Sequence, residues 1–140
     1  SVEKEDAEEE EPTAEELEAM QEQKDARRRK EEVESRALLK GLEEKRALPK
    51  YREMLTIRQN LPAFKMKSKV LQAIEENSVV VVSGDTGCGK TTQLPQLVLD
   101  DWIEKGRGGE CSIIVTQPRR ISAVSVAEHI SRERAEAVGL

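Results

Sequence analysis

Two short apolar runs stand out in a chain that is otherwise rich in charged and polar residues. Val79-Val80-Val81-Val82 and Ile113-Ile114-Val115 are continuous and β-branched, a pattern typical of strands buried on both faces. After each run, apolar residues recur at helical spacing, over residues 91–105 and 121–138. Strand, helix, strand and helix, with roughly 30 residues from strand to strand, predict a βαβ unit of a parallel sheet. We therefore expect an α/β fold for this part of the chain.

The first third of the chain has a helical pattern instead. Thr13 followed by Glu16 forms the sequence signature of a capping box, which predicts a helix start. Residues 15–40 are rich in helix formers, but their apolar positions are too sparse for a coiled-coil seam. We expect a single solvated helix there, and shorter helices over residues 51–59 and 64–76.

These patterns divide the chain into three parts. Residues 1–12 are expected to be a disordered acidic tail, since residues 1–11 hold seven carboxylates and one lysine. Residues 13–48 form a charged α-helical extension, and the α/β unit occupies residues 49–140. Two parallel strands bury too little apolar surface to be stable alone, so this unit is expected to be the beginning of a larger domain.

The charge is distributed unevenly along the chain. Residues 1–48 carry 10 Lys and Arg against 17 Asp and Glu, whereas residues 49–140 carry 13 against 11. With a net charge of −5, and one residue each of Trp, Tyr and Phe, nucleic-acid binding would have to come from a local patch. The run Arg27-Arg28-Arg29-Lys30 is either such a patch or a solvated helix face, and the carboxylates on both sides favour the solvated face.

The cysteine and histidine content excludes several kinds of site. Cys88 and Cys111 lack a C-x-x-C spacing and His129 is the only histidine, so a zinc site or a disulfide framework is not expected. No stretch approaches the roughly 20 apolar residues of a membrane span, and the acidic start lacks a signal pattern. We expect a soluble intracellular protein of the nucleus or cytoplasm, without a membrane partner.

The first apolar run leads directly into a candidate phosphate-binding loop. Residues 84–91 fit the pattern G-x-x-x-x-G-K-[ST], in which glycines let backbone N–H groups point at phosphate oxygens at a helix N-terminus. Lys90 would reach the β- and γ-phosphates, and the Thr91 hydroxyl would bind Mg²⁺. The alternative is a glycine turn that binds nothing. The predicted nucleotide-binding residues of the loop are Gly84, Asp85, Thr86, Gly87, Cys88, Gly89, Lys90, Thr91 and Thr92.

A second motif follows the second apolar run. Thr116-Gln117-Pro118-Arg119-Arg120 places two arginines and a hydroxyl at the carboxyl end of the predicted strand, where the next helix begins. Such a position suits the backbone of a polyanion. The alternative is that the arginines are simply a solvated helix start.

Together the two motifs resemble the DEAH/RHA family of superfamily 2 RNA helicases, and the RNA helicase A-like branch in particular. Gly84 to Gln93 resembles the family's motif I with its Thr-Thr-Gln extension, Thr116 to Arg120 resembles motif Ia, and Leu61-Pro62 resembles the entry to the first core helix. The resemblance implies that residues 49–140 begin the first RecA-like ATP-binding lobe, of the P-loop NTPase class. It also implies ATP, or another nucleoside triphosphate, and Mg²⁺ as cofactors. RNA would be bound by Thr116, Arg119 and Arg120.

The resemblance has one departure and one consequence for activity. Family members commonly carry an arginine thirteen residues after the motif Ia threonine, stacked on the nucleotide base, and here that residue is His129. Two interpretations of His129 remain open: its imidazole contacts the base, or it is simply an exposed residue of the helix. The carboxylate box, the coupling motif and the second lobe of the family do not occur in these residues. An NTP-hydrolysing RNA helicase is therefore expected of a longer protein, and this stretch alone is expected to be inactive.

Two other functions are alternatives to the predicted helicase. The chain would be a non-catalytic binding module if its charged N-terminal helix docked a protein partner. An unrelated phosphate-loop ATPase is the third possibility, which the Thr-Gln-Pro-Arg-Arg segment argues against.

Overall fold

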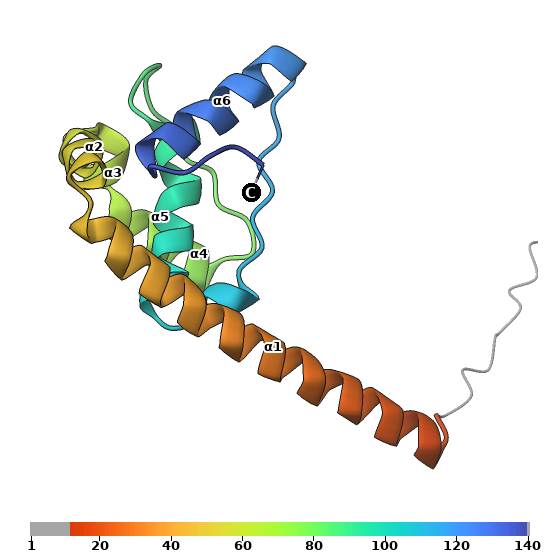
Figure 1. Ribbon diagram of the computed structural model, residues 1–140. Helices are drawn as coiled ribbons and strands as arrows, with labels where there is room; N and C mark the ends of the chain where they lie inside the picture. The colour runs from red at the N-terminus through yellow and green to blue at the C-terminus, as the bar shows by residue number, and fades with distance from the viewer. Residues whose placement is uncertain (1–11, 140) are drawn as a thin grey trace, which may run out of the picture.

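The computed structural model describes residues 12–139 and shows a helical assembly with one long arm (Figure 1). The tail expected over residues 1–12 lies, except for its last residue, outside the described part. In chain order the helices are α1 (Ala14–Ala47), α2 (Pro49–Gln59), α3 (Pro62–Lys65), α4 (Lys67–Glu76), α5 (Lys90–Glu104), the 3₁₀ turn η1 (Gly108–Glu110) and α6 (Arg120–Glu133).

Helix α1 begins at the predicted capping box. The Thr13 hydroxyl accepts the Glu16 amide at 3.3 Å, and the Glu16 carboxylate accepts the Thr13 amide at 2.7 Å. These hydrogen bonds, first from the Thr13 backbone and then from its side chain, lower the pKa of Glu16. The helix extends seven residues past the expected end at residue 40, and Pro49 then begins α2.

The second half of α1 packs against the body of the protein. Ser35 and Leu42 are buried, and the Ser35 hydroxyl accepts the Gly109 amide of η1 at 3.0 Å while donating to the Glu31 carbonyl at 2.7 Å. The expectation of a fully solvated helix is therefore wrong for this half. The first half projects away from the other helices (Figure 1).

A small apolar core joins α1, α2 and α5. Leu42, Tyr51 and Ile103 are each at most 2% exposed and contact one another. Partly buried apolar side chains surround them, namely Leu39, Leu55, Leu99 and Ala135. No helix within the described residues is long and apolar enough to cross a membrane.

The expected α/β fold is wrong for the described residues, since residues 12–139 contain no β-strand. The segments predicted as strands are extended but unpaired, and Figure 1 draws them as plain trace. Val81 and Ile114 are 90% and 86% exposed. A strand is defined by hydrogen bonds to a neighbour, and an apolar run cannot form them by itself.

The helices predicted in this half are present with shifted ends. The segment expected as one helix over residues 64–76 is divided into α3 and α4 at Met66. Helix α6 ends at Glu133 rather than near residue 138, because Ala135 takes a left-handed conformation with φ of 54°.

Candidate nucleotide-binding site

The glycine loop between the first extended segment and α5 is shaped by two left-handed glycines. Gly87 and Gly89 have φ of 81° and 90°, a region that side chains with a Cβ rarely adopt. Gly89 is also the N-cap of α5, and a Cβ there would lie 3.1 Å from both Leu61 Cδ1 and Gln93 Cγ. The loop thus approaches the start of α3 closely, and the Ala63 amide donates to the Cys88 carbonyl at 3.0 Å.

Lys90, the first residue of α5, folds back over the loop. Its Nζ donates to the carbonyls of Gly84 at 2.5 Å and Asp85 at 2.9 Å, and lies 3.3 Å from Cys88 Sγ. Within residues 12–139 these polar contacts of the ammonium are all to the loop itself. No carboxylate neutralises it there, so its charge is available to an anion.

A hollow of about 550 Å³ brings most of the predicted nucleotide-binding residues together with His129. Its volume lies in the range of small-molecule sites. The hollow is lined by Leu61, Thr86, Gly87, Gly89, Lys90, Thr91, Thr92 and His129. A second hollow of about 420 Å³ is lined by the loop residues Gly84, Asp85 and Cys88, among others, and by apolar residues of α3 and α4. The two hollows share Thr86, Gly87 and Lys90.

The residues of the loop fit a magnesium ion bound together with phosphates. Thr91 is exposed and lines the larger hollow, next to Lys90. Residues 12–139 contain no group of three or more His, Cys, Asp or Glu that could hold a metal ion alone. Since Mg²⁺ is usually bound by few protein oxygens plus substrate phosphates, a single threonine hydroxyl at this point is compatible with such a site.

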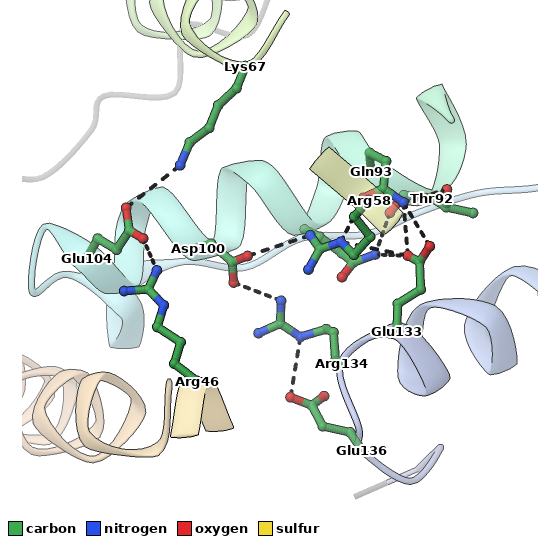
Figure 2. A network of polar contacts seen from close by, with 11 residues as sticks. Arg46, Arg58, Lys67, Thr92, Gln93, Asp100, Glu104, Glu133, Arg134 and Glu136 are labelled. Atoms are coloured by element: carbon green, nitrogen blue, oxygen red, sulfur yellow. Dashed lines mark hydrogen bonds and ion pairs between the residues drawn. The ribbon is translucent and has the colours of Figure 1, made fainter. Parts of the chain in front are cut away.

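A buried polar network joins α2, α5 and α6 (Figure 2), and Gln93 connects it to Thr92, which lines the hollow. Both oxygens of Glu133 accept from Gln93 Nε2, at 3.1 and 2.9 Å, and Glu133 Oε2 also accepts from Gln96 Nε2 at 2.6 Å. Arg58 donates from Nε to Gln93 Oε1 at 2.8 Å and is fully buried. The Glu133 carboxylate on α6 is therefore held by two side chains of α5. Arg58 of α2 in turn holds one of these, Gln93.

The same network continues to the C-terminal end of α6. Asp100 accepts from Arg134 Nη1 at 2.8 Å and lies 3.8 Å from Arg58 Nη2. Burial acts to lower the pKa of Arg134, but the charge of Asp100 and the hydrogen bond to it outweigh burial and raise the pKa. Two guanidinium groups thus face two carboxylates, Asp100 and Glu133, which balances the buried charge.

Sequence reasoning did not single out this network. A signal was present in the spacing of Gln93, Gln96 and Asp100, which recur at helical intervals while the positions between them are all apolar. A polar stripe on a helix that must pack against other elements indicates buried hydrogen-bonding partners.

His129 connects the network to the hollow. Its Nε2 lies 3.2 Å from Glu133 Oε1, one helical turn later, while half of its side-chain surface remains exposed. The ring therefore lines the hollow and also touches the buried network. This position is compatible with the predicted contact with a nucleotide base, which stays a prediction.

The predicted RNA-binding residues lie apart from this hollow. Thr116 and Arg119 are exposed on the extended chain that leads into α6, and Arg120 is the exposed first residue of that helix. None of the three lines the larger hollow. Within the described part of the chain, neither arginine forms an ion pair, so both guanidinium groups are open to an external anion.

Comparisons with known proteins give relatives of similar sequence. No family model matches the chain. The ATP-dependent DNA/RNA helicase DHX36 of Mus musculus is 50% identical over 102 residues, which cover 73% of this chain and 10% of that protein. The DExH-box ATP-dependent RNA helicase DExH1 of Arabidopsis thaliana is 52% identical over 103 residues, covering 74% of this chain and 10% of the relative.

Another Arabidopsis thaliana protein, the DExH-box ATP-dependent RNA helicase DExH3, is 58% identical over 91 residues, or 65% of this chain and 8% of its own length. The chain thus spans about a tenth or less of the length of these relatives.

The sequence motif predicts a site for a nucleoside triphosphate at the glycine loop and Lys90. About half of some hundred residues are identical to those of proteins named as helicases, which identifies the family. Over the matched residues, the chain belongs to the DEAH/DExH-box helicases, which confirms the resemblance seen in its motifs.

Proposed function

We propose that the chain binds ATP with Mg²⁺ and RNA as the first part of an ATP-dependent RNA helicase. The observation that carries the proposal is the hollow in which Lys90, Thr91, Thr92 and His129 meet. The names of the matched relatives support ATP-dependent helicase activity. The chain spans only about a tenth of their length, so activity is proposed for a longer protein that contains it.

Residues that line the hollow have roles that their positions support. Backbone amides at the N-terminus of α5 would bind the phosphate oxygens, assisted by the partial positive charge of the helix end. Lys90 would exchange its loop carbonyls for β- and γ-phosphate oxygens, which are stronger partners because they are charged. Thr91 would hold Mg²⁺, which supplies neutralisation of the phosphate charge. His129 would contact the base.

RNA would bind at the second group of residues. Arg119 and Arg120 are exposed, and α6 begins at Arg120, so guanidinium and backbone N–H groups coincide there. Contacts of this kind hold the phosphate backbone and do not distinguish bases. Hydrolysis needs a group that positions water and a transition-state clamp, for which other parts of a longer protein are required.

Replacing Lys90 tests this function. In the full-length protein, we expect Lys90→Ala to weaken the binding of a non-hydrolysable ATP analogue by more than about 2 kcal/mol, the usual cost of leaving a charged partner unpaired. RNA-stimulated ATP hydrolysis should be lost with it. Lys69→Ala, which removes an exposed lysine of α4, is the matched control and should bind like the wild type. Equal affinities for all three proteins would refute the nucleotide site.

A non-catalytic module that docks a partner is a second candidate, favoured by the projecting half of α1. Leu17 and Met20 on this half are 53% and 49% exposed. If docking were the function, deletion of residues 14–28 would abolish activity in the cell while Lys90→Ala preserved it. The helicase function predicts loss of activity with Lys90→Ala.

A further inference from the structure

We infer that Glu133 is a positioning residue that controls nucleotide affinity by holding the His129 ring at the edge of the hollow. The inference rests on the proposed nucleotide site and extends it to a buried carboxylate that does not line the hollow. Glu133 would act on the base through His129, without touching the nucleotide itself.

The carboxylate of Glu133 is fixed from several sides. Its side chain is only 8% exposed and accepts from Gln93 on both oxygens and from Gln96 on one. A further contact, of Oε1 with His129 Nε2 at 3.2 Å, reaches the half-exposed ring. A buried acceptor that cannot rotate restricts the ring to the orientations that keep this hydrogen bond.

Such restriction has a direct effect on binding. An exposed side chain that must be ordered by a ligand reduces affinity through lost conformational entropy. A ring that is already oriented by Glu133 avoids this loss. The hydrogen bond therefore pre-organises the surface against which a base would stack.

Arg58 extends the arrangement to α2. Its guanidinium is fully buried, donates to Gln93 Oε1 at 2.8 Å, and lies 4.0 Å from Glu133 Oε2. Its Nη1 and Nη2 find no hydrogen-bond partner within the described residues. Arg58 is thus held by its hydrogen bond to Gln93 and by the charges of Glu133 and Asp100, and it holds Gln93 and Glu133 in place in return.

The network also touches the phosphate side of the hollow. Gln93 Nε2 lies 3.1 Å from the Thr92 hydroxyl, and Thr92 lines the hollow. A disturbance of Gln93 would therefore reach the phosphates, whereas a disturbance of the contact between Glu133 and His129 would reach only the base. Ligands with and without a base separate the two effects.

The test compares Glu133→Gln with His129→Ala and with the double variant in the full-length protein. The probes are the Mg²⁺ complexes of a non-hydrolysable ATP analogue and of inorganic tripolyphosphate, which has no base. Each single variant should bind the ATP analogue about two- to fivefold more weakly, the range for one stacking contact at a partly exposed site. Tripolyphosphate affinity should not change in His129→Ala. In Glu133→Gln it should fall less than the affinity for the analogue, because Gln93 also loses an acceptor there. Relative to tripolyphosphate, the double variant should bind the analogue no more weakly than His129→Ala alone, since the effect of Glu133 on the base acts through that ring.

Matched controls exclude general effects of charge and stability. Glu128→Gln makes the same chemical change at an exposed position of α6 next to His129, and should bind both probes like the wild type. If Glu133→Gln does not fold, as judged by thermal unfolding, Glu133→Asp is measured instead. It keeps the charge, draws the carboxylate back from the ring, and should give the same pattern.

Three results would overturn the inference. Losses of analogue affinity relative to tripolyphosphate that add up in the double variant would show that Glu133 does not act through His129. An equal loss for tripolyphosphate would show a purely structural role, and wild-type affinity of the Glu133 variants would show no role. A wild-type protein that binds neither probe would refute the nucleotide site itself, which distinguishes failure of the proposed function from failure of this inference.

Discussion

Gly89 combines two requirements that only glycine meets at this position. Its backbone is left-handed, with φ of 90°, and the side chain of Leu61 lies where a Cβ would point. Both the turn into α5 and the contact with the start of α3 depend on this residue. Because Gly89 has no side chain, the loop can turn into α5 and Leu61, which lines the hollow, can pack close to it.

His129 is the residue whose replacement should strengthen binding. His129→Arg is expected to bind a non-hydrolysable ATP analogue about 0.5–1 kcal/mol more tightly, because a guanidinium carries a permanent charge and a larger stacking surface. Calorimetric titration of the full-length protein measures this. Ser125→Arg, one turn earlier on an exposed part of α6, is the control for added charge. Equal gains in both variants would mean that general electrostatic attraction, rather than stacking, causes the effect.

Arg120 should contribute to RNA affinity without contributing to sequence preference. Arg120→Ala is expected to weaken binding about equally for RNAs of different sequence and to reduce the salt slope by about one or less. Binding titrations over a range of salt concentrations measure both. Arg132→Ala, at the other end of α6, is the matched control. Loss of affinity for one sequence alone would identify Arg120 as a base-reading residue instead.

At the scale of elements, α1 has two halves with different surroundings. The half after residue 30 packs on η1 and α5. The half before it forms ion pairs along the helix, such as that of Arg27 with Glu31 at 2.6 Å. The hydrogen bond of Arg27 to Glu31, and their attraction, raise the pKa of Arg27. The basic run at residues 27–30 is thus partly neutralised along the helix, in agreement with a solvated face.

The contact between α1 and η1 depends on the absence of a side chain at Gly109. A Cβ there would overlap the backbone carbonyl of Glu31. Gly109→Ala is therefore expected to lower the free energy of unfolding by about 1–3 kcal/mol, as in other overpacked sites. Gly41→Ala is the control, since no atom lies within 4 Å of its Cβ position, and should stabilise the helix by about 0.5–1 kcal/mol. Urea unfolding of both variants tests this, and equal effects would contradict the close contact.

At the scale of the whole molecule, apolar surface is distributed unusually. The core is small, while the two extended segments expose most of their β-branched side chains, including Val79, Val81 and Ile114. Exposed and unpaired segments of this composition are templates for association with other chains.

The 140-residue chain should consequently self-associate through these segments. Replacing both Val81 and Ile114 with lysine is expected to suppress concentration-dependent light scattering, because charge on an exposed apolar segment opposes pairing. The unfolding midpoint should change little, since both side chains are already in solvent. Replacing Leu17 and Met20 of α1 with lysine is the control for added charge. Suppression by the control to the same extent would show that net charge, and not these segments, governs association.

Local patterns in the sequence determined the helices and the loop. The capping box fixed the start of α1, because its partners are three residues apart, and the glycine and lysine spacing fixed the loop that leads into α5. Helix ends were less accurate: α6 stops early because of the left-handed Ala135, which no simple spacing signals. Apolar runs identified extended segments but not a sheet.

The sequence by itself therefore determined the motifs, the family and the helical segments, since each depends on residues near one another in the chain. Tertiary structure alone decided that Val79–Val82 and residues 111–116 stay unpaired, because strand pairing depends on distant neighbours. It also decided that Arg58 and Glu133, 75 positions apart, meet behind the loop and that His129 reaches the hollow. Burial of polar groups requires partners from several helices, and only the packing of α2, α5 and α6 supplies them.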